Sequence, residues 1–364
     1  MRKIKIYIFH PYSKVGGADL TISRLINNLS TTKYDIHFIC LGSPGIKRYL
    51  KKKIKITSLK CKRSFAAIPI LKKIILYNLK KDLKFRKVIF LSNQNFANII
   101  SILALNNFKH IKKILIDRNN PIELDLMKNY KNRIIKKLIP LIYPKADKII
   151  GISRELSKDL EKLCKSKVET IYNPSFDKKI LKIKIKKKSN SVKSILCVAR
   201  FEKQKNHMML LKAFKNSQKK LTSNLTLVGF GSEKSNIKNF IKTNNLQNRV
   251  KIVINPSDVY HFYKRADLFV LTSLYEGFGN VIVEAGAFKI PIISTNCKSG
   301  PKEILGNGKF GNLIKIGDVK NLSRLIIKNL EKPNKAKILR MYKSLRRFDI
   351  TKHIKKYEEI FTKV

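Results

Sequence analysis

The sequence predicts an α/β protein with two doubly wound parallel-sheet domains, and three observations support this. The chain has 364 residues, which is too long for one compact core and suits two domains. Its hydrophobic residues (43%) and aromatic residues (9%) supply enough apolar surface for buried cores and exclude whole-chain disorder. Short apolar strands alternate with helix-length segments, which is typical of parallel sheets covered by helices on both faces.

The first domain is expected to span residues 1–178. It opens with a strand at 4–9, a loop from His10 to Gly17, and a helix at 18–29 with apolar residues at i, i+3 and i+4. Further strands are expected at 36–41, 88–91, 114–116, 148–152 and 168–172. Between them, segment 71–83 has lysines beside an apolar stripe at helical spacing, and this predicts a basic amphipathic helix. The stripe consists of Leu71, Ile74, Ile75, Asn78, Leu79 and Leu83.

The second domain is expected at 194–340. A lysine- and serine-rich stretch without periodicity precedes it, and we interpret 179–193 as the linker. Strands are expected at 194–199, 225–228, 250–254, 268–271 and 290–294, and the chain becomes helical after Asp318. Residues 341–364 are expected to be helices that pack back on the first domain. Two such domains in tandem would face a cleft, and ligands bind at the carboxyl ends of parallel strands.

The chain is strongly basic, with 79 Lys and Arg against 24 Asp and Glu, a net charge of +55. Such a charge is typical of proteins that bind nucleic acid, an anionic membrane or anionic substrates. The alternative is that the charge reflects only a composition rich in Lys, Ile and Asn and has no function. The basic residues cluster at 47–63, 72–87 and 128–145, all in the first domain, and no nucleic-acid-binding motif accompanies them.

The cysteines and the apolar segments indicate the compartment. The five cysteines are scattered and contain no C-x-x-C pair, which argues against disulfides or a zinc site and for a reducing compartment. No signal peptide fits the N-terminus, and the longest uncharged run, 88–108, is interrupted by asparagines. We therefore expect a cytoplasmic protein, soluble or peripheral to a membrane.

Three short motifs follow predicted strands. Gly16 and Gly17 precede a helix and could present backbone N–H groups to an anion, although a structural turn explains them equally well. Arg200 and Lys205 follow the first strand of the second domain, where two cations suit a diphosphate leaving group. Gly229 and Gly231 form a weaker signal that a plain tight turn also explains.

The most specific motif runs from Glu276 to Glu284 and contains two glycines just before a helix expected to begin near Asn280. If all eight steps were helical, the two carboxylates would lie about 12 Å apart along the axis. Hydrolytic carboxylate pairs need roughly 5–9.5 Å, so we interpret these glutamates as independent hydroxyl-binding groups. The alternative is that both are ordinary solvated side chains.

Taken in order, Gly16-Gly17-Ala18-Asp19, Arg200-x4-Lys205, Gly229-x-Gly231, Glu276-x7-Glu284 and the Ser-Gly-Pro-Lys-Glu-Ile segment at 299–304 resemble the retaining GT-B glycosyltransferases of family 4. The resemblance covers essentially the whole chain and is densest at 195–316. The segment Asp-Arg-Asn-Asn-Pro at 117–121 further resembles bacterial members that add hexoses or N-acetylhexosamines to surface glycans.

The resemblance implies roles for these residues. The catalytic set would be Arg200, Lys205 and Glu276, with the two cations neutralising the nucleotide diphosphate and Glu276 binding donor-sugar hydroxyls. Glu284 would hold the ribose. The remaining donor-binding residues would be Gly16, Gly17, Gly229, Gly231, Gly277, Phe278, Gly279 and Asn280. His10 and Arg118 are assigned to the acceptor side, and Arg118 stands near where other members place a histidine. Asn206 replaces a glycine that often follows the phosphate-binding lysine.

The sequence therefore predicts a GT-B enzyme that transfers a sugar from a nucleotide-diphosphate donor, most simply a UDP-sugar, with retention and front-face attack. No cofactor and no metal site are expected. The expected partners are a lipid-linked or saccharide acceptor and an anionic membrane surface at the inner face of the cytoplasmic membrane, with no specific nucleic acid. The alternatives are a GT-B sugar-nucleotide epimerase and a non-catalytic basic protein that binds membranes or nucleic acid.

Overall fold

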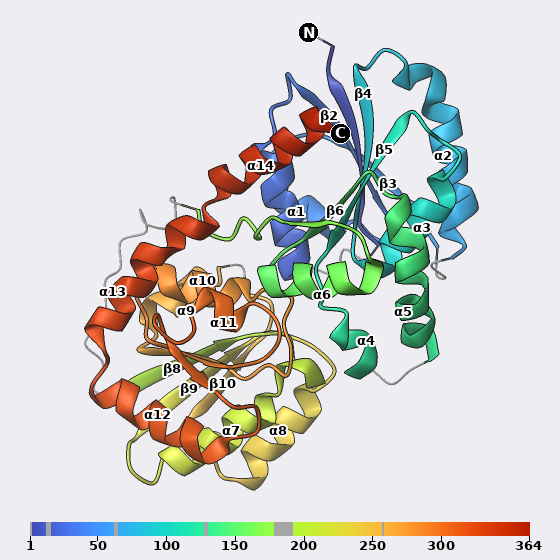
Figure 1. Cartoon of the computed structure of the whole chain (residues 1–364). Coiled ribbons are helices and arrows are strands. Elements are labelled where there is room, and N and C mark those ends of the chain that lie inside the picture. The colour runs from blue at the N-terminus through green and yellow to red at the C-terminus, as the bar shows by residue number, and fades with distance from the viewer. Residues whose placement is uncertain (1, 12–15, 62–64, 127–129, 178–191, 257) are drawn as a thin grey trace. The chain divides into compact units, whose positions relative to one another are not determined.

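The computed structural model describes residues 2–11, 16–61, 65–126, 130–177, 192–256 and 258–364. Most of the expected linker, the loop residues 12–15 and parts of the basic clusters at 47–63 and 128–145 lie outside them. The chain divides into two compact units. Unit 1 comprises Met1–Pro174 with Ile350–Val364, and unit 2 comprises Ser175–Asp349. Each unit is a parallel sheet surrounded by helices (Figure 1), as the GT-B fold requires.

Unit 1 contains a seven-stranded parallel sheet in the order β3-β2-β1-β4-β5-β6-β7. Its strands are β1 (Ile4–Phe9), β2 (Tyr34–Cys40), β3 (Lys55–Ser58), β4 (Lys87–Asn93), β5 (Ile111–Asp117), β6 (Lys148–Gly151) and β7 (Val168–Thr170). Its helices are α1 (Gly17–Asn28), α2 (Ala67–Asp82), α3 (Asn95–Leu105), α4 (Ile122–Leu126), α5 (Tyr130–Ile142), α6 (Arg154–Cys164) and α14 (Ile350–Lys363). The order reverses between β1 and β4, so the connections place helices on both faces of the sheet.

Helices α2 and α3 bury one face of this sheet. Leu71 and Ile75 of α2 pack with Ile100 of α3 against the aromatic side chains of β1 and β4. The prediction that the buried apolar stripe of α2 extends to Leu83 is wrong. The helix stops at Asp82, whose carboxylate accepts a buried hydrogen bond from the Tyr7 hydroxyl at 2.7 Å, and Leu83 is 75% exposed.

Helix α14 completes unit 1. It packs beside α1 (Figure 1), and its last turn is held by Lys87 at the start of β4. The Lys87 ammonium donates to the carbonyls of Phe361, Thr362 and Val364, so a cation binds the orphan carbonyls at the negative end of the helix. The chain returns to unit 1 at Ile350, whereas Met341 packs against Gly286 within unit 2.

Unit 2 contains a six-stranded parallel sheet in the order β10-β9-β8-β11-β12-β13. Its strands are β8 (Lys193–Val198), β9 (Ser223–Val228), β10 (Val250–Val253), β11 (Leu268–Leu271), β12 (Ile292–Thr295) and β13 (Asn312–Ile314). Its helices are α7 (His207–Ser217), α8 (Lys234–Thr243), α9 (Tyr260–Arg265), α10 (Asn280–Ala287), α11 (Pro301–Ile304), α12 (Val319–Glu331) and α13 (Lys335–Ser344). One core of α7, α8 and α12 side chains packs on the sheet.

Two strands were not predicted from the sequence. The edge strand β3 has only four residues, Lys-Ile-Thr-Ser, and lysines precede it instead of an apolar run. Strand β13 has three residues. Both lie at sheet edges, where one side of the strand is unpaired and short polar strands are common.

Candidate active site

The candidate active site in unit 2 is built at the carboxyl ends of β8 and β11. The Lys205 ammonium donates to Glu276 Oε1 at 2.5 Å, and both side chains are mostly buried. Ser273, two residues after β11, donates its hydroxyl to the same oxygen at 2.6 Å. The Lys205–Glu276 bond joins residues that lie 71 positions apart in the chain, because β8 and β11 are neighbours in the sheet.

Arg200 extends from the loop after β8 into solvent. Its guanidinium lies 3.4 Å from the Gln204 side-chain oxygen, and Gln204 in turn donates to the Tyr275 carbonyl at 2.9 Å. The described part of the chain contains no ion pair to Arg200. Arg200 is thus an exposed cation, linked through Gln204 to the loop that carries Glu276. Lys205, in contrast, forms an ion pair with Glu276.

The backbone turns sharply at Asn206, directly after Lys205. Its φ is 46°, in the left-handed region that favours glycine and that asparagine tolerates better than most residues. The carbonyls of Lys205 and Asn206 both accept from the Thr272 hydroxyl, at 3.1 and 3.0 Å. This turn explains why asparagine can replace glycine after Lys205.

Glycines bring the next loop close to Arg200. A Cβ on Gly229 would lie 1.9 Å from the Ala199 carbonyl oxygen, and one on Gly231 would lie 2.4 Å from that of Phe201. No side chain fits at either position without moving the backbone. The pair therefore lets the β9 loop pack directly on the loop after β8.

The backbone of the Glu276 loop is hydrogen-bonded to the segment before α11. The Glu276 N–H donates to the Lys298 carbonyl, and the Ser299 N–H donates to the Glu276 carbonyl, each at 2.7 Å. Gly300, with φ 90°, has room for no Cβ because the Phe278 carbonyl oxygen would lie 1.9 Å away. The Ser-Gly-Pro segment thus holds the strand end that presents Glu276.

The rest of the Glu276–Glu284 motif divides between loop and helix. Helix α10 begins at Asn280, as predicted, and Gly279 before it has φ 104°. The Phe278 side chain packs edge-on against Phe348 in the core, so only its backbone could face a ligand. Glu284 Oε2 accepts from the buried Tyr263 hydroxyl at 3.1 Å, and burial followed by the nearby carboxylate raises the pKa of Tyr263 well above its usual value.

The predicted residues of unit 1 lie at the carboxyl edge of its own sheet. Gly16 is the N-cap of α1, and its N–H donates to the Asp19 carboxylate at 2.9 Å. His10 follows β1 and is buried, with Nε2 3.5 Å from the other Asp19 oxygen. Gly17 begins α1. The Gly-Gly turn is therefore a capped helix start, with a carboxylate at the helix N-terminus.

Arg118 is buried at the end of β5. Its Nε and Nη2 donate to Asn93 Oδ1 at 3.2 and 3.0 Å, and Nη1 donates to Asn173 Oδ1 at 3.0 Å. These partners are neutral amides. Burial lowers the pKa of Arg118, but a guanidinium stays charged in proteins. Arg118 is thus a buried cation bound by amide oxygens.

Sequence reasoning did not identify Ser273, Gln204, Tyr263, Asn93 or Asn173, although each binds a predicted site residue. Ser273 had a usable signal, since it stands directly after a predicted strand and three residues before Glu276. Gln204 lies inside the Arg200-x4-Lys205 motif, but no pattern marks it. Tyr263, Asn93 and Asn173 lie at least 21 positions from their partners.

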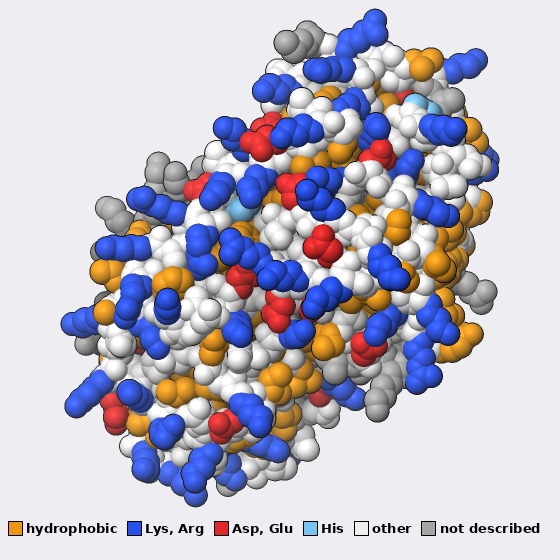
Figure 2. All heavy atoms as spheres, in the orientation of Figure 1, with side chains coloured by type: hydrophobic (Ala, Val, Ile, Leu, Met, Phe, Trp, Pro, Cys, Tyr) orange, Lys and Arg blue, Asp and Glu red, His pale blue; other side chains and the backbone are white. Residues whose placement is uncertain are grey.

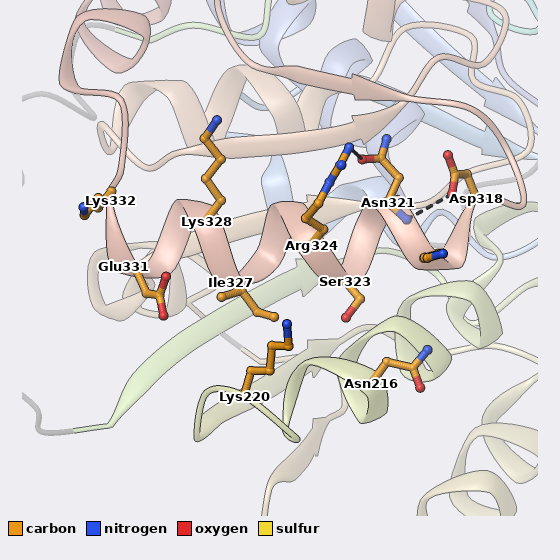
Figure 3. A pocket seen from close by; sticks show the side chains of 11 residues that line it. Asn216, Lys220, Asp318, Asn321, Ser323, Arg324, Ile327, Lys328, Glu331 and Lys332 are labelled. Atoms are coloured by element: carbon orange, nitrogen blue, oxygen red, sulfur yellow. Dashed lines mark hydrogen bonds between the residues drawn. The ribbon is translucent and has the colours of Figure 1, made fainter.

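A hollow also lies elsewhere in unit 2. A cavity of about 630 Å³ opens between α12 and the end of α7 (Figure 3). Arg324, Lys328 and Lys220 line it together with Glu331, and none of the predicted site residues does. Its charged walls carry no chemistry that the cluster around Glu276 lacks, so we place the candidate active site at Glu276.

Comparisons with known proteins identify the family. The family model of the glycosyl transferases group 1 matches residues 178–346, which include the whole Lys205–Glu276 cluster. A glycosyltransferase of uncharacterised specificity from Methanocaldococcus jannaschii is 30% identical over 296 residues, covering 75% of this chain and 71% of that protein. The chain is a glycosyltransferase, and its residues 178–346 match the group 1 domain.

Other relatives of this glycosyltransferase have more informative names. The N-acetylgalactosamine-N,N'-diacetylbacillosaminyl-diphospho-undecaprenol 4-alpha-N-acetylgalactosaminyltransferase of Campylobacter jejuni is 28% identical over 329 residues, 87% of each chain. Among solved structures, Anabaena HepE in complex with UDP-glucose has a TM-score of 0.82 at 18% identity, covering 99% of this chain and 100% of that one. The lipopolysaccharide outer core galactosyltransferase WaaB has a TM-score of 0.74 at 21% identity, covering 99% and 100%. These structures confirm the predicted fold.

Proposed function

We propose that this glycosyltransferase moves a hexose or N-acetylhexosamine from a UDP-sugar to a lipid-linked saccharide, with retention of anomeric configuration, in bacterial surface-glycan synthesis. The observation that carries the proposal is the Lys205–Glu276–Ser273 cluster with Arg200 beside it at a strand end. The Campylobacter relative acts on a diphospho-undecaprenol saccharide by its name, and HepE was solved with UDP-glucose. Both names support the donor and acceptor classes proposed here.

In this proposal the two cations stabilise the charge that develops on the leaving diphosphate. Arg200 is free of carboxylate partners in the described residues and can bind a phosphate by two parallel hydrogen bonds. Lys205 lies against Glu276, so it can shift toward a phosphate once the carboxylate binds sugar hydroxyls. Preorganised charges at such a site commonly supply about 3–4 kcal/mol of transition-state stabilisation.

Glu276 is a poor nucleophile in this arrangement. One of its oxygens accepts from both Lys205 and Ser273, which stabilises the carboxylate as a fixed acceptor. The proposed mechanism is therefore front-face attack, in which the departing phosphate takes the acceptor's proton. Measuring the anomeric configuration of the first product by NMR tests retention directly, and an inverted product would refute it.

We further propose that no metal or other cofactor takes part. The described part of the chain contains no group of three or more His, Cys, Asp or Glu side chains arranged to hold a metal ion. Arg200 and Lys205 supply the positive charge that a divalent ion would supply in other enzymes. Turnover should persist in excess EDTA, and a complete loss that Mg²⁺ restores would refute the proposal.

The acceptor's lipid suggests where the enzyme acts. No helix in the described ranges is long and apolar enough to cross a membrane. We propose peripheral binding to the cytoplasmic face of the membrane through α2, where Leu76 and Tyr77 are 51% and 72% exposed. Four exposed lysines flank them: Lys72, Lys73, Lys80 and Lys81. Each lysine near an anionic bilayer contributes about 1 kcal/mol, which falls off over a Debye length of roughly 8 Å.

General basicity is the competing explanation, and Figure 2 shows lysine and arginine spread over the whole visible face. Flotation with anionic vesicles distinguishes docking through α2 from binding by general basicity. Changing the four α2 lysines to Gln should abolish most binding, whereas four matched changes in unit 2 should not. The matched set is Lys212, Lys234, Lys238 and Lys242, all exposed. Equal losses would refute docking through α2.

A thermal-shift screen against UDP-, GDP- and ADP-sugars tests the enzymatic proposal itself. A ligand present at a hundred times its Kd stabilises the folded state by about 2.7 kcal/mol, so the donor should raise the melting temperature measurably. Conversion of the donor in the absence of any acceptor would instead indicate an epimerase. No response to any nucleotide sugar would indicate a basic binding protein.

A further inference from the structure

An open cavity lies in unit 1, on the face of the sheet that α2 covers. It measures about 360 Å³ and is lined by His37 of β2, Lys55 and Thr57 of β3, and Lys73, Tyr77 and Asn78 of α2. None of these residues belongs to the candidate active site. The predicted acceptor-side residues follow the carboxyl ends of β1 and β5, whereas Lys55 begins its strand.

The apolar contact between α2 and the sheet does not extend to the edge strand β3, and this leaves the cavity open. Early in α2, Leu71 and Ile75 are fully buried against the sheet. One turn later the helix presents Asn78, whose side-chain amide donates to its own Ile74 carbonyl, and Tyr77 points outward. The edge strand β3 places Lys55 beside His37 in register, so polar groups from three elements meet.

His37 is the unusual member of this cavity. Its side chain is 1% exposed, and its Nε2 lies 2.8 Å from the Thr57 hydroxyl. Its Nδ1 is buried and has no hydrogen-bond partner among the described residues. A buried polar atom left unpaired costs about 1–3 kcal/mol, so a ligand that satisfies it gains that amount.

The charges around His37 define the ligand. Lys55 and Lys73 are exposed and have no carboxylate partner in the described ranges, while Lys5 is paired with Asp35 at 2.9 Å. Burial first, then Lys55 and Lys5, lower the pKa of His37 to about 3, against a smaller opposing effect of Asp35, so the imidazole is neutral. Two ammonium groups, hydroxyls and a neutral imidazole suit a compact oxyanion such as phosphate.

The exposed side of α2 identifies the source of that phosphate. Tyr77 lines the cavity and is 72% exposed, with the Lys81 ammonium 5.0 Å from its ring centre. Tyrosine and lysine together are typical of protein surfaces that lie at the head-group level of a bilayer. We propose that this cavity binds the phosphate head group of an anionic membrane lipid. The inference rests on the proposed docking of α2 on a membrane and not on the transfer reaction.

The test compares vesicles of equal surface charge but different head groups. One set contains phosphatidylcholine with phosphatidylglycerol, and the other contains phosphatidylcholine with oleate, adjusted to the same zeta potential. We expect the wild type to bind the phosphatidylglycerol vesicles about tenfold more tightly, equivalent to about 1.4 kcal/mol. The Lys55→Gln/Lys73→Gln variant should bind both sets alike. The matched variant Lys80→Gln/Lys81→Gln, on the same helix, should bind more weakly overall but keep the tenfold preference.

Soluble glycerol phosphate provides a second readout. It should shift the imidazole NMR signals of His37 in the wild type and in Lys80→Gln/Lys81→Gln, but not in Lys55→Gln/Lys73→Gln. A wild type without head-group preference, or the same loss of preference in both variants, would overturn the proposal. A shift with glycerol phosphate but no preference among vesicles would assign the cavity to a free phosphate and overturn the lipid source. Turnover with a soluble saccharide acceptor should be unchanged in Lys55→Gln, a change outside the proposed docking set, which separates this test from that of the proposed function.

Discussion

Each unit holds a mostly buried cation at the carboxyl edge of its sheet, and the two cations are neutralised differently. In unit 2, Lys205 forms an ion pair with Glu276 at 2.5 Å, and Ser273 donates to the same carboxylate. In unit 1, Arg118 is held by the amide oxygens of Asn93 and Asn173. We call the first edge balanced because a carboxylate binds its cation directly. We call the second edge unbalanced because neutral amides bind Arg118 and the Asp19 carboxylate acts on it only at longer range.

This difference indicates how the two edges can respond to substrate. At the balanced edge, a ligand must exchange partners with the ion pair, and the same carboxylate that holds the lysine can then bind sugar hydroxyls. At the unbalanced edge, an anionic group would gain a charge-assisted hydrogen bond without displacing a carboxylate from Arg118. Arg118 is thus suited to orient a charged part of a substrate, and Lys205 to respond to a leaving diphosphate.

The largest effect is expected from removing the cations of unit 2. Lys205→Ala or Arg200→Ala should lower turnover roughly a hundred- to a thousandfold, since one lost charge stabiliser costs about 3–4 kcal/mol. Steady-state kinetics with the donor found in the thermal-shift screen provide the measurement. Lys203→Ala is the matched control, because Lys203 is exposed in the same loop. Near-wild-type turnover in either variant would remove that cation from the mechanism.

Glycine-to-alanine substitutions at the carboxyl edges of the two sheets should lower the free energy of unfolding to different extents. Gly229→Ala would place a Cβ 1.9 Å from a carbonyl oxygen, so the backbone must move. We expect a loss of about 1–3 kcal/mol in the free energy of unfolding, as for other overpacked sites. Gly16→Ala meets nothing within 4 Å and has φ −136°, so it should cost little. Urea denaturation of both variants measures the difference, and equal losses would contradict the packing argument.

Arg118→Gln should affect substrate use more than stability. The buried guanidinium lacks a carboxylate partner in the described residues, so its hydrogen bonds are offset by the cost of burying the charge. We expect a change in unfolding free energy below about 1 kcal/mol, and a rise in acceptor KM of roughly tenfold to a hundredfold from a lost charge-assisted bond. A stability loss of several kcal/mol with unchanged KM would make Arg118 purely structural.

The last comparison concerns pH, and the stability contributions of His207 in unit 2 and Asp117 in unit 1 should change with pH in opposite directions. Burial followed by Lys205 lowers the pKa of His207 from 6.5 to about 4, so the folded state binds fewer protons than the unfolded state in that window. The stability that His207 contributes is therefore lost as pH falls below 6.5, by up to about 1.4 kcal/mol per pH unit. His207→Leu should remove this slope, measured as the unfolding free energy at about pH 5.5 and 7.5.

The stability contribution of Asp117, next to Arg118, should depend on pH in the opposite direction. Burial raises its pKa to about 7, against a smaller lowering by the hydrogen bond that the Tyr143 hydroxyl donates at 2.7 Å. Its contribution to stability is present below the unfolded pKa of 3.8 and is lost as pH rises through 7. Asp117→Asn should flatten that part of the profile. Slopes of the same sign from His207 and Asp117 would show that the two edges do not differ in this way.

The local features of the candidate site were predictable from the sequence because each lies within one short window. Strand β1 and helix α10 begin at the predicted residues, Ile4 and Asn280. Hydrophobic periodicity identifies such elements, and glycines such as Gly279 mark turns that other residues enter only with strain. The end of α2 was mispredicted because periodicity alone cannot show that Asp82, not Leu83, is buried by a bond to Tyr7.

By itself, the sequence determined which chemical groups stand at strand ends: Arg200 and Lys205 after one strand, Glu276 after another, and Arg118 after a third. Only the tertiary structure decided what each of them touches. Lys205 meets Glu276 across 71 residues, and Arg118 meets Asn173 across 55, because sheet order brings those strand ends together. The physical reason is that local conformation depends on neighbours within a few residues, whereas the pairing of charges depends on long-range packing that no short window contains.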